Sequence, residues 1–147
     1  MKYLLFISLF PIVFSVECHV CSGADSTTGR LKANLRNAMF AKRIPNPKGS
    51  GNCNSKASTS TCTGEVCVKD VVTYKFKYRF SIYYFHTYTK YCGKNTTAQL
   101  PNSCVQTGNQ AVTEDYVATP NRCICNDKQY CNAKDLVAAR LKLQSQD

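Results

Sequence analysis

The chain has 147 residues, ten of them cysteine, and its 19 Lys and Arg outnumber its 9 Asp and Glu to give a net charge of +10. This length predicts a single domain. No run beyond residue 15 approaches the about 18 consecutive apolar residues of a transmembrane helix, so the composition excludes a protein with helical membrane spans.

Residues 1–15 have the pattern of a secretory signal peptide. Lys2 gives a positive start, an apolar stretch follows, and Val13 and Ser15 are small enough to flank a cleavage site. We expect the mature protein to begin at Val16 and to be secreted.

The mature chain divides into a cysteine-rich domain, residues 16–132, and a C-terminal tail, residues 133–147. The apolar part of the tail is short and is interrupted by Arg140 and Lys142. It therefore predicts neither a membrane span nor a lipid-anchor signal, although it can form a short helix. We expect an extracellular protein.

Residues 26–52 form a basic segment that has no acidic residue and ends in alternating Pro and Gly. We interpret it as a long, partly mobile insert between two cysteines. Four apolar residues recur at helical spacing and predict a short amphipathic helix within it: Leu31, Leu35, Ala38 and Met39.

Residues 68–91 give the strongest strand signal, because they contain no Gly, Pro or Asn and alternate between apolar and polar residues. The alternation places Val72, Tyr74, Phe76, Tyr78 and Phe80 opposite Thr73, Lys75, Lys77, Arg79 and Ser81. A single strand of this length would be unusual, so we predict a hairpin with a turn or bulge near residues 79–84.

Two features follow the central hairpin. Asn95-Thr96-Thr97 matches the N-glycosylation pattern in a polar link, which predicts a glycoprotein. A third hairpin is expected between Cys104 and Cys123, with turns at Gly108-Asn109 and at residues 119–121 (Thr-Pro-Asn).

Ten cysteines in a short exported chain predict a framework of disulfide bonds. Zinc binding is the competing use, because Cys18 and Cys21 form a C-x2-C pair. A structural zinc site needs a second such pair, and the chain has only His19 and His86 as further nitrogen ligands. We predict no metal and no cofactor, while the connectivity of the disulfides cannot be derived from spacing.

The order of the cysteines resembles that of the ten-cysteine three-finger superfamily, which includes snake neurotoxins and the urokinase-receptor and lymphocyte-antigen modules. The resemblance is carried by Cys18-x2-Cys21, by the order of the later cysteines and by the terminal Cys131-Asn132. It implies an all-β, toxin-like fold in which three antiparallel hairpins, or fingers, extend from a disulfide hub. The basic insert would then belong to the first finger.

Two features depart from the family pattern. Ile124 separates Cys123 from Cys125, where the family usually has adjacent cysteines, and the gap from Cys21 to Cys53 is long for a first finger. The Cys-x-Cys variant is similar to small secreted cysteine-rich proteins of nematodes, including the ET-module type.

The resemblance also implies structural roles for individual residues. It implies that the side chain of Asn132 hydrogen-bonds backbone near the start of the domain, whereas an ordinary turn asparagine is the alternative. The implied disulfide pairs are Cys18–Cys67, Cys21–Cys53, Cys62–Cys92, Cys104–Cys123 and Cys125–Cys131.

Function is expected to lie on the faces and tips of the fingers. Lys75, Lys77, Arg79 and Tyr83 are the candidate binding residues, because clustered positive charge attracts acidic partners. An extracellular protein receptor fits best, and sulfated glycans and anionic membranes are further acidic partners, whereas nucleic acid is not expected. The alternative is a solvated strand face that protects a sheet edge.

Catalysis is not expected. His86 has no Asp or Glu near it in the sequence, and His19 lies beside Glu17 but between two cysteines. The second functional hypothesis is a cationic membrane-active protein, antimicrobial or cytolytic, with residues 31–44 in the membrane interface. We favour receptor binding, because Lys42 would share the helix face of the apolar residues.

Overall fold

The computed structural model describes residues 15–25, 32–45, 53, 60–96, 99–100 and 102–132. The expected signal peptide up to residue 14, much of the basic insert and the C-terminal tail lie outside these residues. The described part is a small, disulfide-rich all-β protein with one short helix. Its elements are β1 (Val16–His19), β2 (Cys21–Ala24), α1 (Ala33–Ala41), β3 (Thr61–Gly64), β4 (Val66–Tyr78), β5 (Ser81–Gly93), β6 (Ser103–Gln106), β7 (Ala111–Val112) and β8 (Val117–Cys125).

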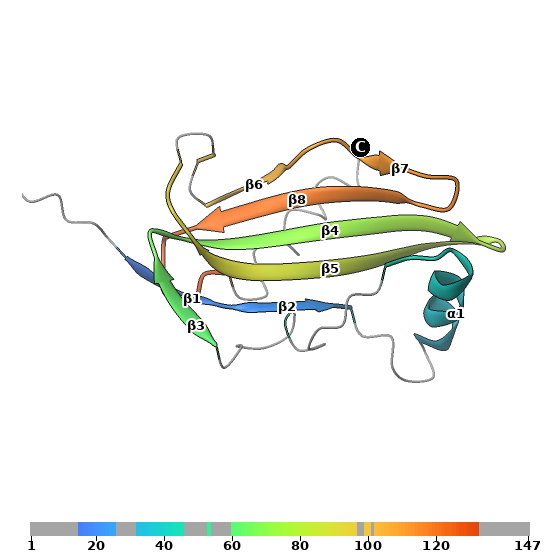
Figure 1. Ribbon diagram of the computed structural model, residues 1–147, viewed down its shortest axis with the longest axis horizontal. Coiled ribbons are helices and arrows are strands. Elements are labelled where there is room, and N and C mark those ends of the chain that lie inside the picture. The colour runs from blue at the N-terminus through green and yellow to red at the C-terminus, as the bar shows by residue number, and fades with distance from the viewer. Residues whose placement is uncertain are drawn as a thin grey trace, which may run out of the picture.

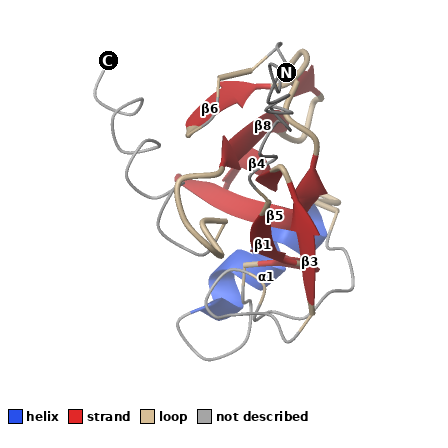
Figure 2. Cartoon of the chain, turned by 90° about the vertical axis from the view of Figure 1, so that its left-hand side faces the viewer, coloured by secondary structure: helices blue, strands red, loops and turns tan. Residues whose placement is uncertain are grey.

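Most strands form one antiparallel sheet in the order β2-β5-β4-β8-β6, and β7 also pairs with β8 (Figure 1). β1 and β3 form a separate antiparallel pair. Figure 2, viewed from the end where these two strands lie, shows α1 to one side of the stacked strands.

β4 and β5 form the predicted central hairpin, joined by Arg79 and Phe80. Each strand has 13 residues, which corresponds to about 44 Å at about 3.4 Å per residue. Arg79 has a positive φ of 54°. A positive φ is required at the first central residue of one type of tight hairpin turn, where glycine is the usual residue. The alternation in the sequence predicts that Phe80 lies on the same strand face as the other aromatic residues. This prediction is wrong, because β4 ends at Tyr78 and Phe80 is fully exposed in the turn.

All ten cysteines are paired, and none is free. The pairs are Cys18–Cys67, Cys21–Cys53, Cys62–Cys92, Cys104–Cys123 and Cys125–Cys131, the same five that the resemblance implies. They gather at the end of the sheet away from the hairpin tip, and we call this end the disulfide hub. Its densest part is one buried cluster that contains Val16, Cys18, Cys67, Cys125 and Cys131.

Asn132 is buried in the disulfide hub, with 1% of its surface exposed. Its Oδ1 accepts a hydrogen bond from the His19 N–H (3.1 Å), and its Nδ2 donates to the carbonyls of His19 (3.0 Å) and Val68 (3.2 Å). One side chain therefore joins the end of the domain to β1 and β4. This is the arrangement that the resemblance implies, and it is not that of a simple turn residue.

α1 covers the aromatic side of the sheet near the hairpin tip. Ala38, Met39 and Ile44 are buried against Phe76 and Phe85 of the central hairpin. The predicted helical spacing is therefore present from Ala33 onward, and Leu31 lies outside the described residues. Because the strongly apolar side of α1 faces the sheet, this region has its own core, separate from the disulfide hub.

The third hairpin differs from its prediction at one of its two turns. Gly108 has the positive φ of a turn residue between β6 and β7, but residues 119–121 lie inside β8. Pro120 fits there because its carbonyl accepts a hydrogen bond from the N–H of Thr107 (3.0 Å). Its backbone nitrogen therefore faces the same side, away from β4, where no ladder hydrogen bond is lost.

Candidate binding surface on the central hairpin

The half of the β4–β5 hairpin near its tip has two different faces. The covered face lies under α1 and carries Tyr74, Phe76, Tyr78, Tyr83 and Phe85. The open face lies on the other side and carries Thr73, Lys75, Lys77, Ile82, Tyr84, Val117 and Thr119. The alternation in the sequence produces this division, because successive side chains of a strand point to opposite faces.

A pocket of about 540 Å³ lies over the open face. Lys75 is the cross-strand partner of Tyr84, and Lys77 is the partner of Ile82. Ile82 and Tyr84 expose 58% and 53% of their surface. Exposed apolar side chains that adjoin one another are typical of an interaction surface, and here they alternate with two cations on paired strands.

The turn at residues 113–116 forms one wall of this pocket. The Thr113 hydroxyl oxygen accepts hydrogen bonds from the N–H groups of Asp115 (3.2 Å) and Tyr116 (2.9 Å). The Tyr116 ring packs edge-on against Tyr74, with 5.5 Å between centroids, and Asp115 forms an ion pair with Lys42 (3.2 Å). Contacts on the covered face therefore position a wall of the open face.

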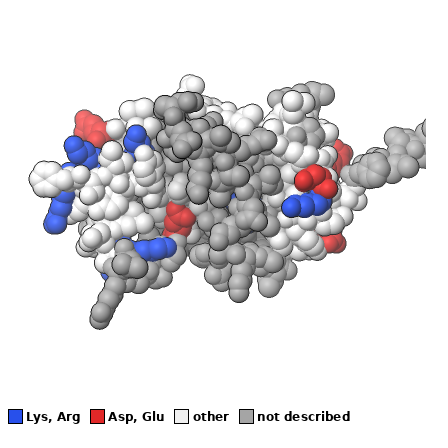
Figure 3. All heavy atoms as spheres, turned by 180° about the vertical axis from the view of Figure 1, so that it is seen from behind, with Lys and Arg blue, Asp and Glu red and all other residues white. Residues whose placement is uncertain are grey.

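The charges of the open face are arranged asymmetrically. Lys75 and Lys77 are exposed, and neither forms an ion pair within the described part of the chain. Glu114 lies in the turn at the pocket wall, where Asp115 is already paired with Lys42. Figure 3 shows Lys and Arg side chains near the left end of the molecule, which is the end with the hairpin tip.

The four predicted binding residues do not share one face. Lys75 and Lys77 lie on the open face, whereas Tyr83 lies on the covered face and stacks on Phe76 with 5.8 Å between ring centroids. Arg79 lies at the turn, with its guanidinium 5.4 Å from the centre of the Tyr78 ring. Sequence reasoning missed this separation, because the change of direction at the turn sends Arg79 away from the two lysines.

His86 has an acidic partner that the sequence does not reveal. The Asp25 carboxylate lies 2.7 Å from His86 Nδ1 and accepts hydrogen bonds from the His86 N–H (2.9 Å) and the Tyr88 hydroxyl (2.8 Å). Burial by itself raises the pKa of Asp25, but the hydrogen bonds from His86 and Tyr88 outweigh it and lower that pKa. Burial and the nearby Asp25 raise the pKa of Tyr88 well above its usual range.

These three residues join the end of β2 to β5 through hydrogen bonds. A histidine that acts as a base needs a nucleophile or a substrate at its other ring nitrogen. Among the described residues, none hydrogen-bonds His86 Nε2. The non-enzymatic interpretation stays a prediction. No acidic residue lies near His86 in the sequence, but Asp25 lies beside it in the fold.

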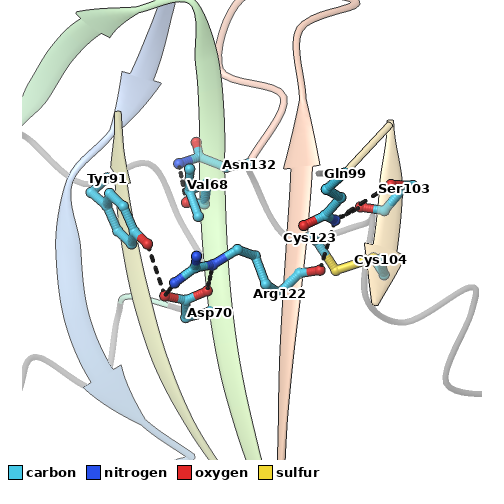
Figure 4. A network of polar contacts seen from close by, with 9 residues as sticks. All are labelled: Val68, Asp70, Tyr91, Gln99, Ser103, Cys104, Arg122, Cys123 and Asn132. Atoms are coloured by element: carbon cyan, nitrogen blue, oxygen red, sulfur yellow. Dashed lines mark hydrogen bonds and ion pairs between the residues drawn. A yellow bond between two sulfur atoms is a disulfide. The ribbon is translucent and has the colours of Figure 1, made fainter. Parts of the chain in front are cut away.

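A second polar network joins three strands near the disulfide hub (Figure 4). Arg122 donates to both carboxylate oxygens of Asp70, at 2.7 and 3.0 Å, and the Tyr91 hydroxyl donates to the same carboxylate (2.9 Å). Gln99 donates to the carbonyls of Arg122 (3.1 Å) and Ser103 (3.0 Å). All of these groups hydrogen-bond one another across strands, so we assign the network a structural role.

Two buried lysines are a further feature that the sequence pattern misses. Lys69 and Lys90 are cross-strand partners, and each exposes only 1% of its surface. The Lys69 ammonium lies 5.3 Å from the centre of the Tyr88 ring, a cation–π geometry. Burial lowers the pKa of Lys90, because it disfavours the charged ammonium.

Among the described residues, one group has metal-ligand types close together, namely Cys125, Asp127 and Cys131. The two cysteines form a disulfide with each other, and a disulfide sulfur is not the thiolate that metals bind. Asn95, the predicted glycosylation site, is exposed. Thr97 lies outside the described residues, and glycosylation stays a prediction.

No protein-family model matches the chain, and no curated protein or solved structure matches it significantly. None of the described helical residues forms a segment with the length and apolar character of a membrane span. Five disulfides fit a protein of an oxidising, extracellular environment. What the described residues establish is therefore a class, the small disulfide-rich all-β proteins.

Proposed function

We propose that this chain is a secreted, non-enzymatic binding module of the three-finger type. The disulfide hub supports the three-finger assignment, because the pairing is the one that the family uses and three segments extend from it. These are the segment from β2 to β3, the central β4–β5 hairpin and the segment from β6 to β8. The Cys-x-Cys spacing fits the variant that is similar to nematode secreted proteins, whereas the long first segment is a departure from the family pattern.

In this proposal the open face binds an acidic extracellular partner, most simply a receptor protein. The observation that carries the proposal is the combination of Lys75 and Lys77, which form no ion pair with any described residue, with the half-exposed Ile82 and Tyr84. Apolar contact contributes affinity, and the lysines contribute orientation and a fast encounter. The net charge of +10 extends that attraction beyond the surface itself.

The wall at residues 113–116 makes the charge of the open face differ from one side to the other. A partner carboxylate is attracted over Lys75 and Lys77 and repelled by Glu114 at the wall. We therefore expect the partner's acidic groups to lie over β4 and its apolar groups over Ile82 and Tyr84.

Binding of the labelled secreted protein to intact cells tests this function. In the double variant Lys75→Glu/Lys77→Glu, saturable and protease-sensitive binding should fall by at least about tenfold, because two attractions become repulsions. The control is Lys94→Glu/Lys128→Glu, which changes the net charge equally at exposed positions away from the tip. Equal losses of cell binding in both double variants would show that the effect comes from net charge alone, which would argue against a binding surface.

The membrane-active alternative is weakened by the position of α1. Ala38, Met39 and Ile44 are packed against the sheet, so they are not available to enter a lipid interface unless the helix detaches. Phe40 is exposed, but it is a single apolar residue. Dye release from vesicles that contain anionic lipid separates the hypotheses, since efficient leakage by the wild-type protein would favour the alternative.

A further inference from the structure

A second, smaller pocket lies between α1 and the hairpin tip, and the proposed receptor surface does not include it. Its volume is about 220 Å³. Its polar and aromatic lining comes from α1, the turn and the two strand ends: Asn34, Asn37, Tyr78, Arg79, Phe80, Ser81 and Tyr83. No acidic side chain lines it.

The polar groups of this pocket are available to a ligand. Within the part of the chain that the structure describes, no hydrogen bond or ion pair uses the Asn34 and Asn37 amides, the Arg79 guanidinium or the Ser81 hydroxyl. Asn34 and Asn37 are three residues apart on α1 and therefore lie on the same side of the helix. Together they place two amides opposite one guanidinium.

Arg79 is held in place at a structural cost. Its φ of 54° is unfavourable for a residue with a side chain, and its guanidinium lies 5.4 Å from the centre of the Tyr78 ring. A non-glycine residue in this conformation at an exposed turn is the kind of backbone strain that gathers at binding sites. The planar guanidinium is suited to bind two oxygens of a carboxylate or sulfate at once.

We infer that this pocket binds a saccharide unit that carries a carboxylate or sulfate group. Arg79 binds the anionic group, Asn34, Asn37 and Ser81 hydrogen-bond the hydroxyls, and the partly buried Tyr78 and Tyr83 form the aromatic side of the pocket. The small volume suits one sugar unit at the end or edge of a longer glycan. Two amides beside a single cation distinguish this pocket from the one over the open face, which has two lysines paired with apolar residues across the strands and one amide, Gln110.

Calorimetric titration of the intact secreted protein tests this inference. The probes are a sulfated heparin disaccharide, an unsulfated disaccharide with one glucuronate, a neutral disaccharide, and a tetraglutamate peptide. We expect both acidic disaccharides to bind and the neutral disaccharide to bind at least about tenfold more weakly, because only the acidic ones pair with Arg79. Equal binding of the neutral disaccharide would overturn the role of Arg79, and tighter binding of tetraglutamate than of either acidic disaccharide would overturn the choice of a sugar.

Matched variants separate this pocket from general positive charge. Arg79→Gln should weaken the acidic disaccharides by roughly tenfold, Arg79→Lys by less because it keeps the charge and loses the paired contact, and Asn37→Ala by a few-fold. The control Lys77→Gln removes the same charge on the open face and should change affinity by less than about twofold. Equal losses in Arg79→Gln and Lys77→Gln overturn the inference.

The two proposals fail separately. Cell binding that depends on Lys75 and Lys77, together with no disaccharide binding, would remove this inference and leave the receptor surface intact. Disaccharide binding that depends on Arg79, without any effect of the lysine variants on cell binding, would support this inference and remove the receptor surface. Circular dichroism of each variant establishes that it is folded before titration.

Discussion

The two ends of the central hairpin are held by different forces. At the disulfide hub, β4 and β5 are fixed by Cys67 and Cys92, and Asn132 hydrogen-bonds the neighbouring backbone. At the tip no disulfide is present in the described residues, and α1 packs on an aromatic cluster instead. Covalent bonds therefore maintain the fold at one end, whereas the positions of the candidate binding surfaces at the other end depend on side-chain packing.

This difference has a consequence for how the molecule tolerates substitution. A change near the tip alters only non-covalent contacts, so the disulfide hub can keep the fold while the surfaces change. A change in the disulfide hub affects the connections of all strands at once. The following predictions test this division, beginning with the largest effect.

Removal of the Cys18–Cys67 disulfide should have the largest effect. The variant Cys18→Ala/Cys67→Ala opens a loop with a sequence separation of 49, and the chain-entropy relation gives a loss of about 4 kcal/mol in the free energy of unfolding. Denaturant unfolding followed by circular dichroism measures it. The matched control is Cys125→Ala/Cys131→Ala, with a separation of 6 and an expected loss of about 2 kcal/mol; the reverse order would contradict the role given to the long connection.

At the tip, Phe85→Ala should cost about 3 kcal/mol in unfolding free energy, because Phe85 is fully buried between the hairpin and α1. We expect α1 to detach, so that amide exchange speeds up in α1 more than in the residues around Asn132. The control Phe80→Ala removes a fully exposed ring and should change stability by less than about 0.5 kcal/mol. Equal amide exchange at both ends would show that they unfold as one unit.

Asn132→Ala should lower the free energy of unfolding by about 2 kcal/mol, because it removes the hydrogen bonds of the buried Asn132 side chain to the backbone of His19 and Val68. The disulfides should still form, which peptide mapping by mass spectrometry checks. Asn126 is exposed, and Asn126→Ala is the comparison. If the two variants were equally stable, the hydrogen bonds of Asn132 would be of no importance to the fold.

Asp25→Asn should have the smallest effect, about 1 kcal/mol at neutral pH, and it should depend on pH. The pKa of Asp25 is lowered in the folded protein, so its contribution is complete above the unfolded value of 3.8 and is lost as the pH falls through the folded value. Wild type and variant should therefore converge in stability once the pH lies well below the lowered pKa of Asp25. Asp127→Asn at an exposed site is the control, and a difference that persists at low pH would contradict this explanation.

Much of the fold could be predicted because the signals are local. The alternation from Val72 to Tyr78 reports strand faces directly, and the helical spacing of Ala38 and Met39 reports one side of α1. The disulfide pairs followed from a family resemblance and not from physical reasoning. Within the third hairpin, Gly108 correctly predicted a turn. Pro120 did not, because proline occurs at the edge of a sheet as well as in loops.

The rest could not be predicted because it depends on contacts between distant segments. Asp25 and His86 meet only when β2 pairs with β5, and nothing near either residue in the sequence signals this. Lysine is ordinarily exposed, so the pattern gives no sign that Lys69 and Lys90 are buried. The division of the candidate binding residues between two pockets requires knowing where the hairpin turns and which face α1 covers.

Pro120 has a further consequence, for association between molecules. Between β6 and β7 the outer edge of β8 belongs to neither ladder and accepts a hydrogen bond from the Thr107 N–H at the Pro120 carbonyl; an incompletely paired edge is a template for association with a second chain. A proline at this point offers no N–H to an incoming strand, so edge-to-edge polymerisation is disfavoured there. The residue that looks like a turn former in the sequence thus helps to keep the molecules apart.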